Sequence, residues 1–518
     1  MTRADFDVAI VGFGPVGAMG AFTLAAAGLR VAVLDRETEV VEIPRAVGID
    51  GEIVRAFQRL GYGDEIEATT QPPRARDEIA FTNSKREPYF ATGFPTIGHN
   101  GYRDMAFFDQ PELEAPIREF IAAQGKVELR LGNEATAIGQ DASSVTLEFH
   151  PVGGGETESL TASYVIGCDG ASSFVREALA IPWRSLGYDQ DWLVIDVVLD
   201  DMDVLPTMSM QVCDPARLAT YICVKDPNRR WEFQLLPGET REEMLRPERI
   251  EALLDEWLPR ERYTIRRAAV YQFHAATAER WREGRVFLAG DAAHQTPPFL
   301  GQGLNAGFRD VVNLGWKLPL VLAGVCDDAL LDTYAAERDA HAHDLVDWAV
   351  AIGKLMEALA AQEAGRPPAS PDDADQSSGY GQGRSAPPLH GGAIMVDQIS
   401  DEGSTGYLFR QPRVSVSGGD PVWLDELLGP GFSVVARTEA DLVVSDGNRR
   451  FLDEIGAHLV SLEGVEATEG DIDRLFETSA AAIIRPDRYV FGASGDDLDL
   501  DQLVSALAAK LAFAGASD

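Results

Sequence analysis

Glycine and acidic residues near the N-terminus have the types and spacing needed to bind a phosphate-bearing ligand. Gly12, Gly14 and Gly17 directly follow an apolar run, FDVAIV, and precede a small-residue segment of helical composition. Glycines at this spacing allow a tight turn and a close approach of the backbone to a pyrophosphate, whose charge the N–H groups at a helix start can bind. Asp35 follows the next apolar run, RVAVL, at the position from which an acid accepts hydrogen bonds from a ribose. The pattern predicts a dinucleotide site, against the alternative of a βαβ unit that binds no nucleotide.

A second stretch that could bind a ligand spans residues 284–317. Its apolar run ends at Gly290 and Asp291, where an acidic side chain would emerge at the carboxyl end of a strand. A loop rich in proline and glycine follows, and a helical pattern starts at Leu304. Open α/β sheets bind ligands at this edge, and a helix start favours an electron-rich group. Taken alone, the stretch is also compatible with a plain strand-loop-helix crossover.

The elements that must position these residues have an α/β order. Strands are predicted at residues 6–11, 30–34 and 164–170, with a helix between the first two. The third strand ends in a further acid and glycine, Asp169 and Gly170. Residues 127–131 and 144–149 are predicted to pair as a hairpin around a polar turn.

The patterns divide the 518 residues into three units. A Rossmann-like nucleotide-binding domain is discontinuous, at residues 1–182 and 280–361. Alternating runs predict an inserted antiparallel β-sheet, the substrate domain, at residues 183–279, to which residues 72–105 contribute. A linker rich in Pro, Ser, Gly, Asp and Gln at residues 362–388 leads to an α/β module at residues 389–518.

Charge and cysteine usage exclude several classes of partner. With 45 basic and 83 acidic residues the net charge is −38, which repels nucleic acid and anionic membrane surfaces. The four cysteines have neither CxxC nor metal-ligand spacing, so we expect no metal site and a reduced, cytoplasmic protein. The first residues lack a basic segment followed by an apolar one, so we expect no secretory signal, and no apolar run reaches membrane-spanning length.

Four motifs stand in one order along the chain: GFGPVG at residues 12–17, PRA at 44–46, CDG at 168–170 and GDAAHQTPPFLGQGLN at 290–305. Together they resemble the single-component FAD-dependent aromatic hydroxylases, the group A flavoprotein monooxygenases. The segments PRAVGID, DALLDTYAAERDAHA and RPDRYVFG are most similar to the branch that includes 3-(3-hydroxyphenyl)propionate hydroxylase. That branch carries a C-terminal thioredoxin-like domain without a redox CxxC, and this chain has no cysteine after Cys326. The resemblance implies such a domain here, with a structural or dimer-forming role, and a homodimer.

The resemblance implies FAD-binding roles at matching positions. The first glycines would hold the pyrophosphate, and the acid of the GD motif would bind the ribityl side. The loop after it would lie along the isoalloxazine ring, and the DG acid is associated with both FAD and the nicotinamide nucleotide. The implied cofactor-binding set is Gly12, Gly14, Gly17, Asp35, Arg36, Arg45, Gln110, Asp169, Gly290, Asp291, Pro298, Gly301, Gly303, Leu304 and Asn305.

The implied reaction is hydroxylation of a phenol, with a small hydroxylated aromatic acid as the expected substrate. NADH or NADPH would reduce FAD, and O2 would form a flavin C4a-hydroperoxide whose distal oxygen attacks the activated ring. A tailoring oxygenase for a larger, polyketide-like aromatic substrate uses the same flavin frame and stays open. A nucleotide-binding scaffold without turnover is disfavoured by the complete flavin loop, and a flavin halogenase by the absence of WxWxIP.

No side chain stands out from the sequence as the base that deprotonates a phenol. His274 and Tyr271 end the predicted substrate sheet near the flavin motif and are the candidates. Arg217, on the inserted sheet, could bind a substrate carboxylate, and a solvent-facing arginine is the competing interpretation. We expect His294, within the GD motif, to be structural, and Asp50 to cap the helix that follows it.

Overall fold

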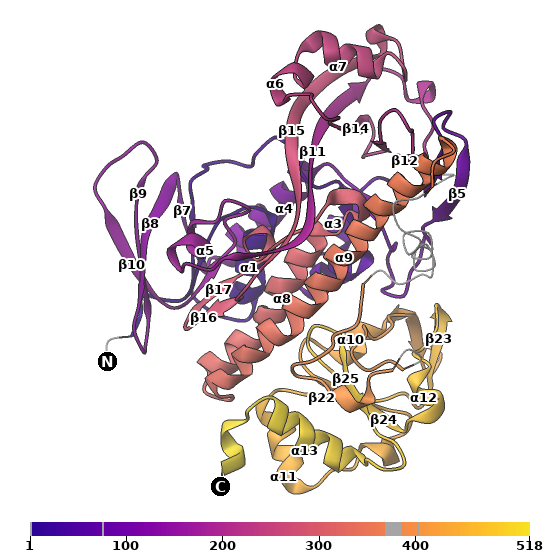
Figure 1. Ribbon diagram of the computed structural model, residues 1–518. Helices are drawn as coiled ribbons and strands as arrows, with labels where there is room; N and C mark the ends of the chain where they lie inside the picture. Colours follow the sequence, from indigo (N-terminus) through magenta and orange to yellow (C-terminus); the bar gives the residue numbers. More distant parts are fainter. Residues whose placement is uncertain (1–2, 75–76, 368–385, 401–402, 518) are drawn as a thin grey trace.

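The computed structural model describes residues 3–74, 77–367, 386–400 and 403–517 (Figure 1). Most of the predicted linker, residues 368–385, lies outside the described residues.

A mainly parallel sheet forms the first part of the molecule. Its order is β16-β17-β10-β1-β2-β7, and all pairs except β16 with β17 are parallel. The bounds are β1 (Phe6–Val11), β2 (Val31–Asp35), β7 (Val127–Leu131), β10 (Glu158–Gly167), β16 (Arg282–Glu283) and β17 (Val286–Leu288). Because parallel strands end at one edge, the glycine loop, Asp35, the CDG motif and the GD motif meet there.

The hairpin predicted from residues 127–131 and 144–149 is wrong. β7 pairs in parallel with β2, whereas β9 (Val145–Pro151) pairs with β8 (Asn133–Gln140) and β10. The half-polar strand β8 supplies the antiparallel partner that the apolar pattern did not reveal.

Helices α1 (Pro15–Ala26) and α8 (Gly303–Leu322) pack closely against each other at small residues. A Cβ added at Gly307 would lie 2.6 Å from a methyl carbon of Val16, and one at Gly315 would lie 2.4 Å from a methyl carbon of Thr23. This close approach, together with α4 (Gln110–Gln124) beside α1, fixes the N-terminus of α8 near the glycine loop.

The second sheet has the order β18-β15-β11-β14-β13-β12-β4-β5. In Figure 1 the long strands β11 and β15 run from this sheet down to the parallel sheet. The strand bounds are β4 (Glu78–Thr82), β5 (Pro88–Gly93), β11 (Trp183–Leu199), β12 (Ser209–Val212), β13 (Ala219–Ile222), β14 (Asn228–Gln234), β15 (Tyr263–Ala278) and β18 (His294–Gln295).

The two faces of the second sheet are covered by different elements. One face packs Leu193, Ile195, Trp231 and other apolar side chains against α6 (Arg241–Met244) and α7 (Pro247–Leu254). The other face packs Trp192 against Phe299 and the long helix α9 (Asp332–Glu363). A sheet covered on both faces can bury polar side chains between its strands and a neighbouring domain.

The C-terminal part forms a sheet of order β22-β21-β24-β25. β21 (Ser433–Ala436) pairs in parallel with β22 (His458–Ser461) and antiparallel with β24 (Ala481–Ile484), which pairs antiparallel with β25 (Val490–Ala493). With α11 (Asp446–Glu454), α12 (Leu475–Thr478) and α13 (Leu500–Lys510) between or after the strands, this is a thioredoxin-like arrangement. The predicted α/β fold class, with its inserted antiparallel sheet and this terminal module, is confirmed.

Buried ion pairs attach the C-terminal part to the rest of the chain. Arg55 donates from Nε, at 2.9 Å, and from one terminal nitrogen, at 2.7 Å, to the two carboxylate oxygens of Asp425. Arg485 binds Glu337 of α9 at 2.8 Å and Asp487 at 2.6 Å. These side chains are almost fully buried, so separating the two parts would leave unpaired charges.

Candidate functional site

The glycine loop between β1 and α1 has the geometry of a phosphate cradle. A Cβ at Gly12 would lie 2.4 Å from the carbonyl oxygen of Cys168, and one at Gly17 would lie 1.9 Å from the carbonyl oxygen of Gly12. Gly14, in contrast, has nothing within 4 Å of its Cβ position. It is the N-cap of α1, which has no side-chain cap and no acid in its first turn. The loop therefore presents free helix-start N–H groups to open space, as an anion site requires.

Asp35 lies against this loop at the end of β2. Its carboxylate accepts hydrogen bonds from the backbone N–H of Phe13 and, at 2.7 Å, from that of Glu37. The side chain of Arg36 is exposed and pairs with Glu37. Asp35 thus lies where a ribose-binding acid is expected, whereas Arg36 points to solvent.

The loop of residues 44–46 is held from two sides. Gln110 accepts hydrogen bonds from the N–H groups of Arg45 and Ala46, both at 2.8 Å. From the second sheet, Arg230 donates to the carbonyl of Pro44 at 2.6 Å and to that of Arg45 at 2.8 Å. The guanidinium of Arg45 makes no hydrogen bond or ion pair among the described residues, so it is available to a bound anion.

Asp291 follows the carboxyl end of β17, in the turn at Gly290–Ala292. Its side chain is exposed, yet the surrounding protein raises the pKa of its carboxyl by desolvation, with the positive charges of His294 and Arg45 opposing this. Within the described part of the chain it accepts no hydrogen bond. A carboxylate that is deep, accessible and unpartnered fits a ligand that brings hydroxyl groups.

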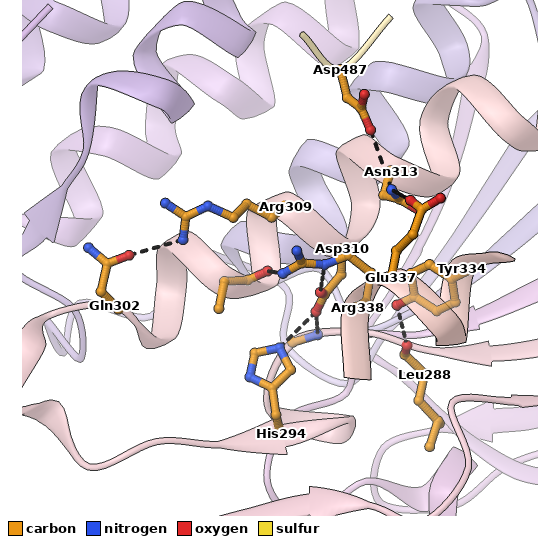
Figure 2. A network of polar contacts seen from close by, with 12 residues as sticks. Leu288, His294, Gln302, Arg309, Asp310, Asn313, Tyr334, Glu337, Arg338 and Asp487 are labelled. Carbon is orange, nitrogen blue, oxygen red and sulfur yellow. Dashed lines mark hydrogen bonds and ion pairs between the residues drawn. The ribbon is translucent and has the colours of Figure 1, made fainter. Parts of the chain in front are cut away.

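A buried network fixes the turn that carries Asp291 (Figure 2). Asp310 of α8 accepts a hydrogen bond from the N–H of Gly290 at 2.9 Å, and His294 Nε2 lies 2.8 Å from the same carboxylate. Arg338 of α9 donates to Asp310 at 2.9 Å. The structural role expected for His294 is confirmed, because its ring is buried and bound to this carboxylate.

The loop before α8 forms the next part of the site. Gly301 has a φ of +65°, and Gly303 has nothing within 4 Å of its Cβ position. Asn305 donates to the carbonyls of Gly301 at 3.0 Å and Gly48 at 3.3 Å, which fixes the loop against the turn before Asp50. α8 begins without a side-chain cap and without an acid in its first turn, so its N–H groups can bind negative charge. Pro298 lies in the short helix before Gly301, and Leu304 lies in the first turn of α8.

Asp169 is engaged by its own chain. It accepts hydrogen bonds from the hydroxyl of Ser173 at 2.5 Å and the N–H of Val175 at 3.0 Å, at the start of α5 (Phe174–Ala178). Its carboxylate orders the CDG turn, which lies against Gly12. Asp50 is the N-cap of α2 (Gly51–Arg59), as predicted, and it also pairs with Arg309.

His274 lies on the face of the second sheet opposite to the one that carries Trp192. In the register of β11 with β15, Trp192 lies opposite Tyr271 and Asp189 lies opposite His274. Neighbouring positions on a strand point to opposite faces, so Tyr271 shares the face of Trp192 whereas His274 points away from the flavin loop. His274 is bound to Asp189 at 2.5 Å.

Arg217 does not present a free cation to a substrate. Its guanidinium binds both oxygens of Glu239, at 2.8 Å and 2.6 Å. These hydrogen bonds lower the pKa of Glu239 to about 2. Arg217 lines a groove at the side of the sheet near the end of α9, with Lys354 and Arg366.

The sequence patterns missed the polar side chains of β14. Arg230 pairs with Asp196 at 2.7 Å while it holds the 44–46 loop, and Arg267 lies 2.9 Å from Asp196. The sequence feature that could have indicated these side chains is NRRWEFQ, in which polar and aromatic residues alternate. Such alternation usually indicates a solvated face, but here both faces are covered.

Comparison with known proteins agrees with this site. Residues 5–349 match the family model described as FAD binding domain, and residues 406–510 match the HcaD C-terminal domain. The chain is 34% identical over 527 residues to a probable NADH-specific resorcinol 4-hydroxylase of Rhodococcus jostii, covering 98% of this chain and 96% of that protein. It is 35% identical to 3-(3-hydroxy-phenyl)propionate/3-hydroxycinnamic acid hydroxylase 2 of Burkholderia vietnamiensis, covering 94% and 93%.

A solved structure shows the same fold with the cofactor bound. The crystal structure of aklavinone-11 hydroxylase with FAD and aklavinone superposes with a TM-score of 0.82 at 25% identity, covering 99% of this chain and all of that chain. The open positions at Gly14 and Gly303, the two uncapped helix starts and the unpartnered Asp291 fit FAD. The chain therefore belongs to the FAD-dependent aromatic hydroxylases, a family of flavoprotein monooxygenases.

Proposed function

We propose that this chain uses FAD, NADH and O2 to hydroxylate a small phenolic compound, with a hydroxylated aromatic acid as the preferred class. The observation that carries the proposal is the high and nearly complete similarity to proteins named as hydroxylases of resorcinol and of 3-(3-hydroxyphenyl)propionate. The relative named as NADH-specific supports NADH over NADPH.

We assign the cofactor contacts as follows. The N–H groups at Gly14 and the start of α1 bind the pyrophosphate, next to Asp35 at the adenosine ribose. Asp291 binds the ribityl hydroxyls, and Arg45 adds positive charge nearby. The loop from Pro298 to Asn305 carries the flavin ring. Asp169 orders the CDG turn and Arg36 points to solvent, so we assign neither to direct contact with the cofactor, since their side chains are paired elsewhere.

FAD, when bound, supplies the transfer of a hydride from NADH and the activation of O2. The protein's own residues position the cofactor and the substrate, stabilise negative charge and exclude water. The uncapped start of α8 favours negative charge on the ring system placed against it. Trp192, Phe273 and Phe299 form an aromatic wall with ring centroids 5.3 Å to 6.2 Å apart, which keeps water from this side of the site.

A larger aromatic substrate is the second candidate, since aklavinone-11 hydroxylase shares the fold. The lower identity to that protein than to the small-phenol relatives favours the first proposal. Tyr271 stays a candidate for substrate contact because it shares the sheet face that carries Trp192. The homodimer and the cytoplasmic location stay predictions, and within the described residues no helix could span a membrane.

The test is a substrate panel on the FAD-loaded protein. NADH oxidation and hydroxylated product are measured with resorcinol, 3-(3-hydroxyphenyl)propionate, 3-hydroxycinnamate and a fused-ring phenol. 3-Phenylpropionate, which lacks the hydroxyl, is the matched control and should give no product. Hydroxylation of the fused-ring phenol alone would favour the second candidate, and a protein that binds no FAD would contradict both.

A further inference from the structure

Glu232 is a buried acid in the middle of the sheet face that looks toward the flavin loops. It lies on β14 opposite Val194 of β11 and Thr220 of β13. The residues at either side of it in sequence, Trp231 and Phe233, point into the apolar cluster on the other face. Glu232 therefore points away from that cluster and toward the flavin-binding domain.

Two contacts on the same face bracket Glu232. Arg230, two residues before it, reaches the carbonyls of Pro44 and Arg45. On the other side Thr220 donates to Gln211, which in turn donates to the carbonyl of Phe299 at 3.4 Å. The carboxyl of Glu232 thus lies between the places where the sheet contacts the 44–46 loop and the loop expected along the flavin ring.

No side chain of the described residues satisfies this carboxyl. Glu232 is 2% exposed, and it makes neither a hydrogen bond nor an ion pair there. The two nearby guanidinium groups already have a carboxylate partner, because Arg230 and Arg267 both bind Asp196. A buried acid kept only for stability normally has a partner, so an unpartnered one that faces a ligand site points to a ligand.

The charged and titratable groups around Glu232 set its proton affinity. Desolvation, opposed by Arg230 and Arg267 and reinforced by Asp196, raises the pKa of Glu232 to about 7. Tyr271 of β15 lies on the same face, and from the flavin side the 44–46 loop contributes Arg45. An acid that ionises near neutral pH is matched to accepting a proton under working conditions.

We propose that Glu232 is the catalytic base that accepts the proton of the substrate's phenolic hydroxyl. This inference rests on the proposed function, in which the substrate is a phenol. The O–H bond of the phenol breaks, the proton moves to the Glu232 carboxylate, and the electron pair stays on the phenol oxygen. The ring carbons conjugated with that oxygen become more electron-rich and take the new oxygen. The ring carbon that takes the new oxygen loses its hydrogen as a proton to water, which restores the aromatic ring. Glu232 returns its proton to the original phenol oxygen, so the product is neutral and the residue ends the cycle ionised.

A binding experiment without NADH tests the proton transfer directly. The probe is 4-nitrophenol, an acidic phenol that is mostly ionised at about pH 8, where Glu232 is also mostly ionised. Two adjacent anions in a dry site share one proton, so we expect FAD-loaded wild-type protein to take up about one proton per 4-nitrophenolate bound. E232Q should bind the phenolate without proton uptake, since an amide can donate to it. Proton uptake is measured by calorimetry in buffers of different ionisation enthalpy.

Kinetics give the second readout. In wild-type protein the product formed per NADH oxidised should rise through about pH 7, and in E232Q it should be flat and lower by at least about 100-fold, with anaerobic flavin reduction kept. T264V, altered at an exposed position of β15 opposite Val198, should keep the wild-type proton uptake and pH dependence.

Several results would overturn the proposal. If wild-type protein and E232Q took up protons equally, or if wild-type protein took up none, Glu232 would not be the base that accepts the phenol's proton. The assignment as a phenol hydroxylase would still stand. A wild-type protein that binds neither 4-nitrophenol nor 3-(3-hydroxyphenyl)propionate would instead refute the proposed function and this inference with it.

Discussion

Replacing Glu232 by glutamine should stabilise the protein, and more so at high pH. A carboxyl whose pKa is higher in the folded than in the unfolded chain opposes folding when it ionises. Stability is therefore lost as the pH rises from the unfolded value toward the folded value, and it stays lower above that. Glutamine cannot ionise, so the variant avoids this loss.

The magnitude follows from the burial of Glu232. A rise of its pKa from 4.5 to about 7 corresponds to roughly 3 kcal/mol, at about 1.4 kcal/mol per pH unit. Between about pH 5.5 and about pH 8.5 the advantage of E232Q should grow by about 2 kcal/mol. If residues 5–349 unfold as one cooperative unit, the Tm of E232Q minus the Tm of wild-type protein should be roughly 3 °C larger at the higher pH than at the lower pH.

The assay is scanning calorimetry of the FAD-loaded proteins at both pH values. The matched control is E239Q in the same sheet domain, because Arg217 lowers the pKa of Glu239 to about 2 and keeps it ionised at both pH values. E239Q should be less stable than wild-type protein by an amount that does not change with pH. A pH-independent effect of E232Q, or an advantage that shrinks as the pH rises, would refute the reasoning.

Three further predictions concern the cofactor and the interfaces. Asp291→Asn should weaken FAD binding by about tenfold without lowering the Tm of the apoprotein, measured by fluorescence titration, because it removes one charged acceptor; unchanged affinity would contradict its ribityl role. Arg230→Ala should lower the free energy of unfolding by about 3–5 kcal/mol, because Asp196 loses one of its two arginine partners. It should also weaken FAD binding, because the 44–46 loop loses its contact with the sheet. Arg230→Lys should restore part of the stability. Arg485→Met should destabilise the chain by about 3–5 kcal/mol in urea and expose the C-terminal part to limited proteolysis, because Glu337 loses its main partner; a protease pattern like that of wild-type protein would argue against ion-pair docking.

Local spacing was enough to predict the loops that form the candidate cofactor site. The glycines at 12, 14 and 17, and the acid at Asp291, each lie within a short strand-turn-helix segment whose geometry follows from nearby residues. The alternation of apolar and polar residues also predicted the inserted sheet. These features need no knowledge of distant parts of the chain.

Contacts between distant segments were not accessible in this way. Arg230 and Pro44 are 186 residues apart, and only the packing of the second sheet on the 44–46 loop brings them together. The sequence also did not show that His274 and Tyr271 take opposite faces of β15, because that depends on the register with β11. Glu232 was overlooked because an alternating strand looks the same whether its polar face meets water or a second domain.

The central claim is that the chain inserts one atom of O2 into a phenol with electrons from NADH. In the most direct measurement, the FAD-loaded protein is incubated with NADH, isotopically labelled O2 and either 3-(3-hydroxyphenyl)propionate or resorcinol. The product is then analysed by mass spectrometry. The account predicts a dihydroxylated or trihydroxylated product, respectively, in which the single added oxygen atom carries the label. NADH oxidation that yields only hydrogen peroxide with both phenols, or a new hydroxyl without the label, would contradict it.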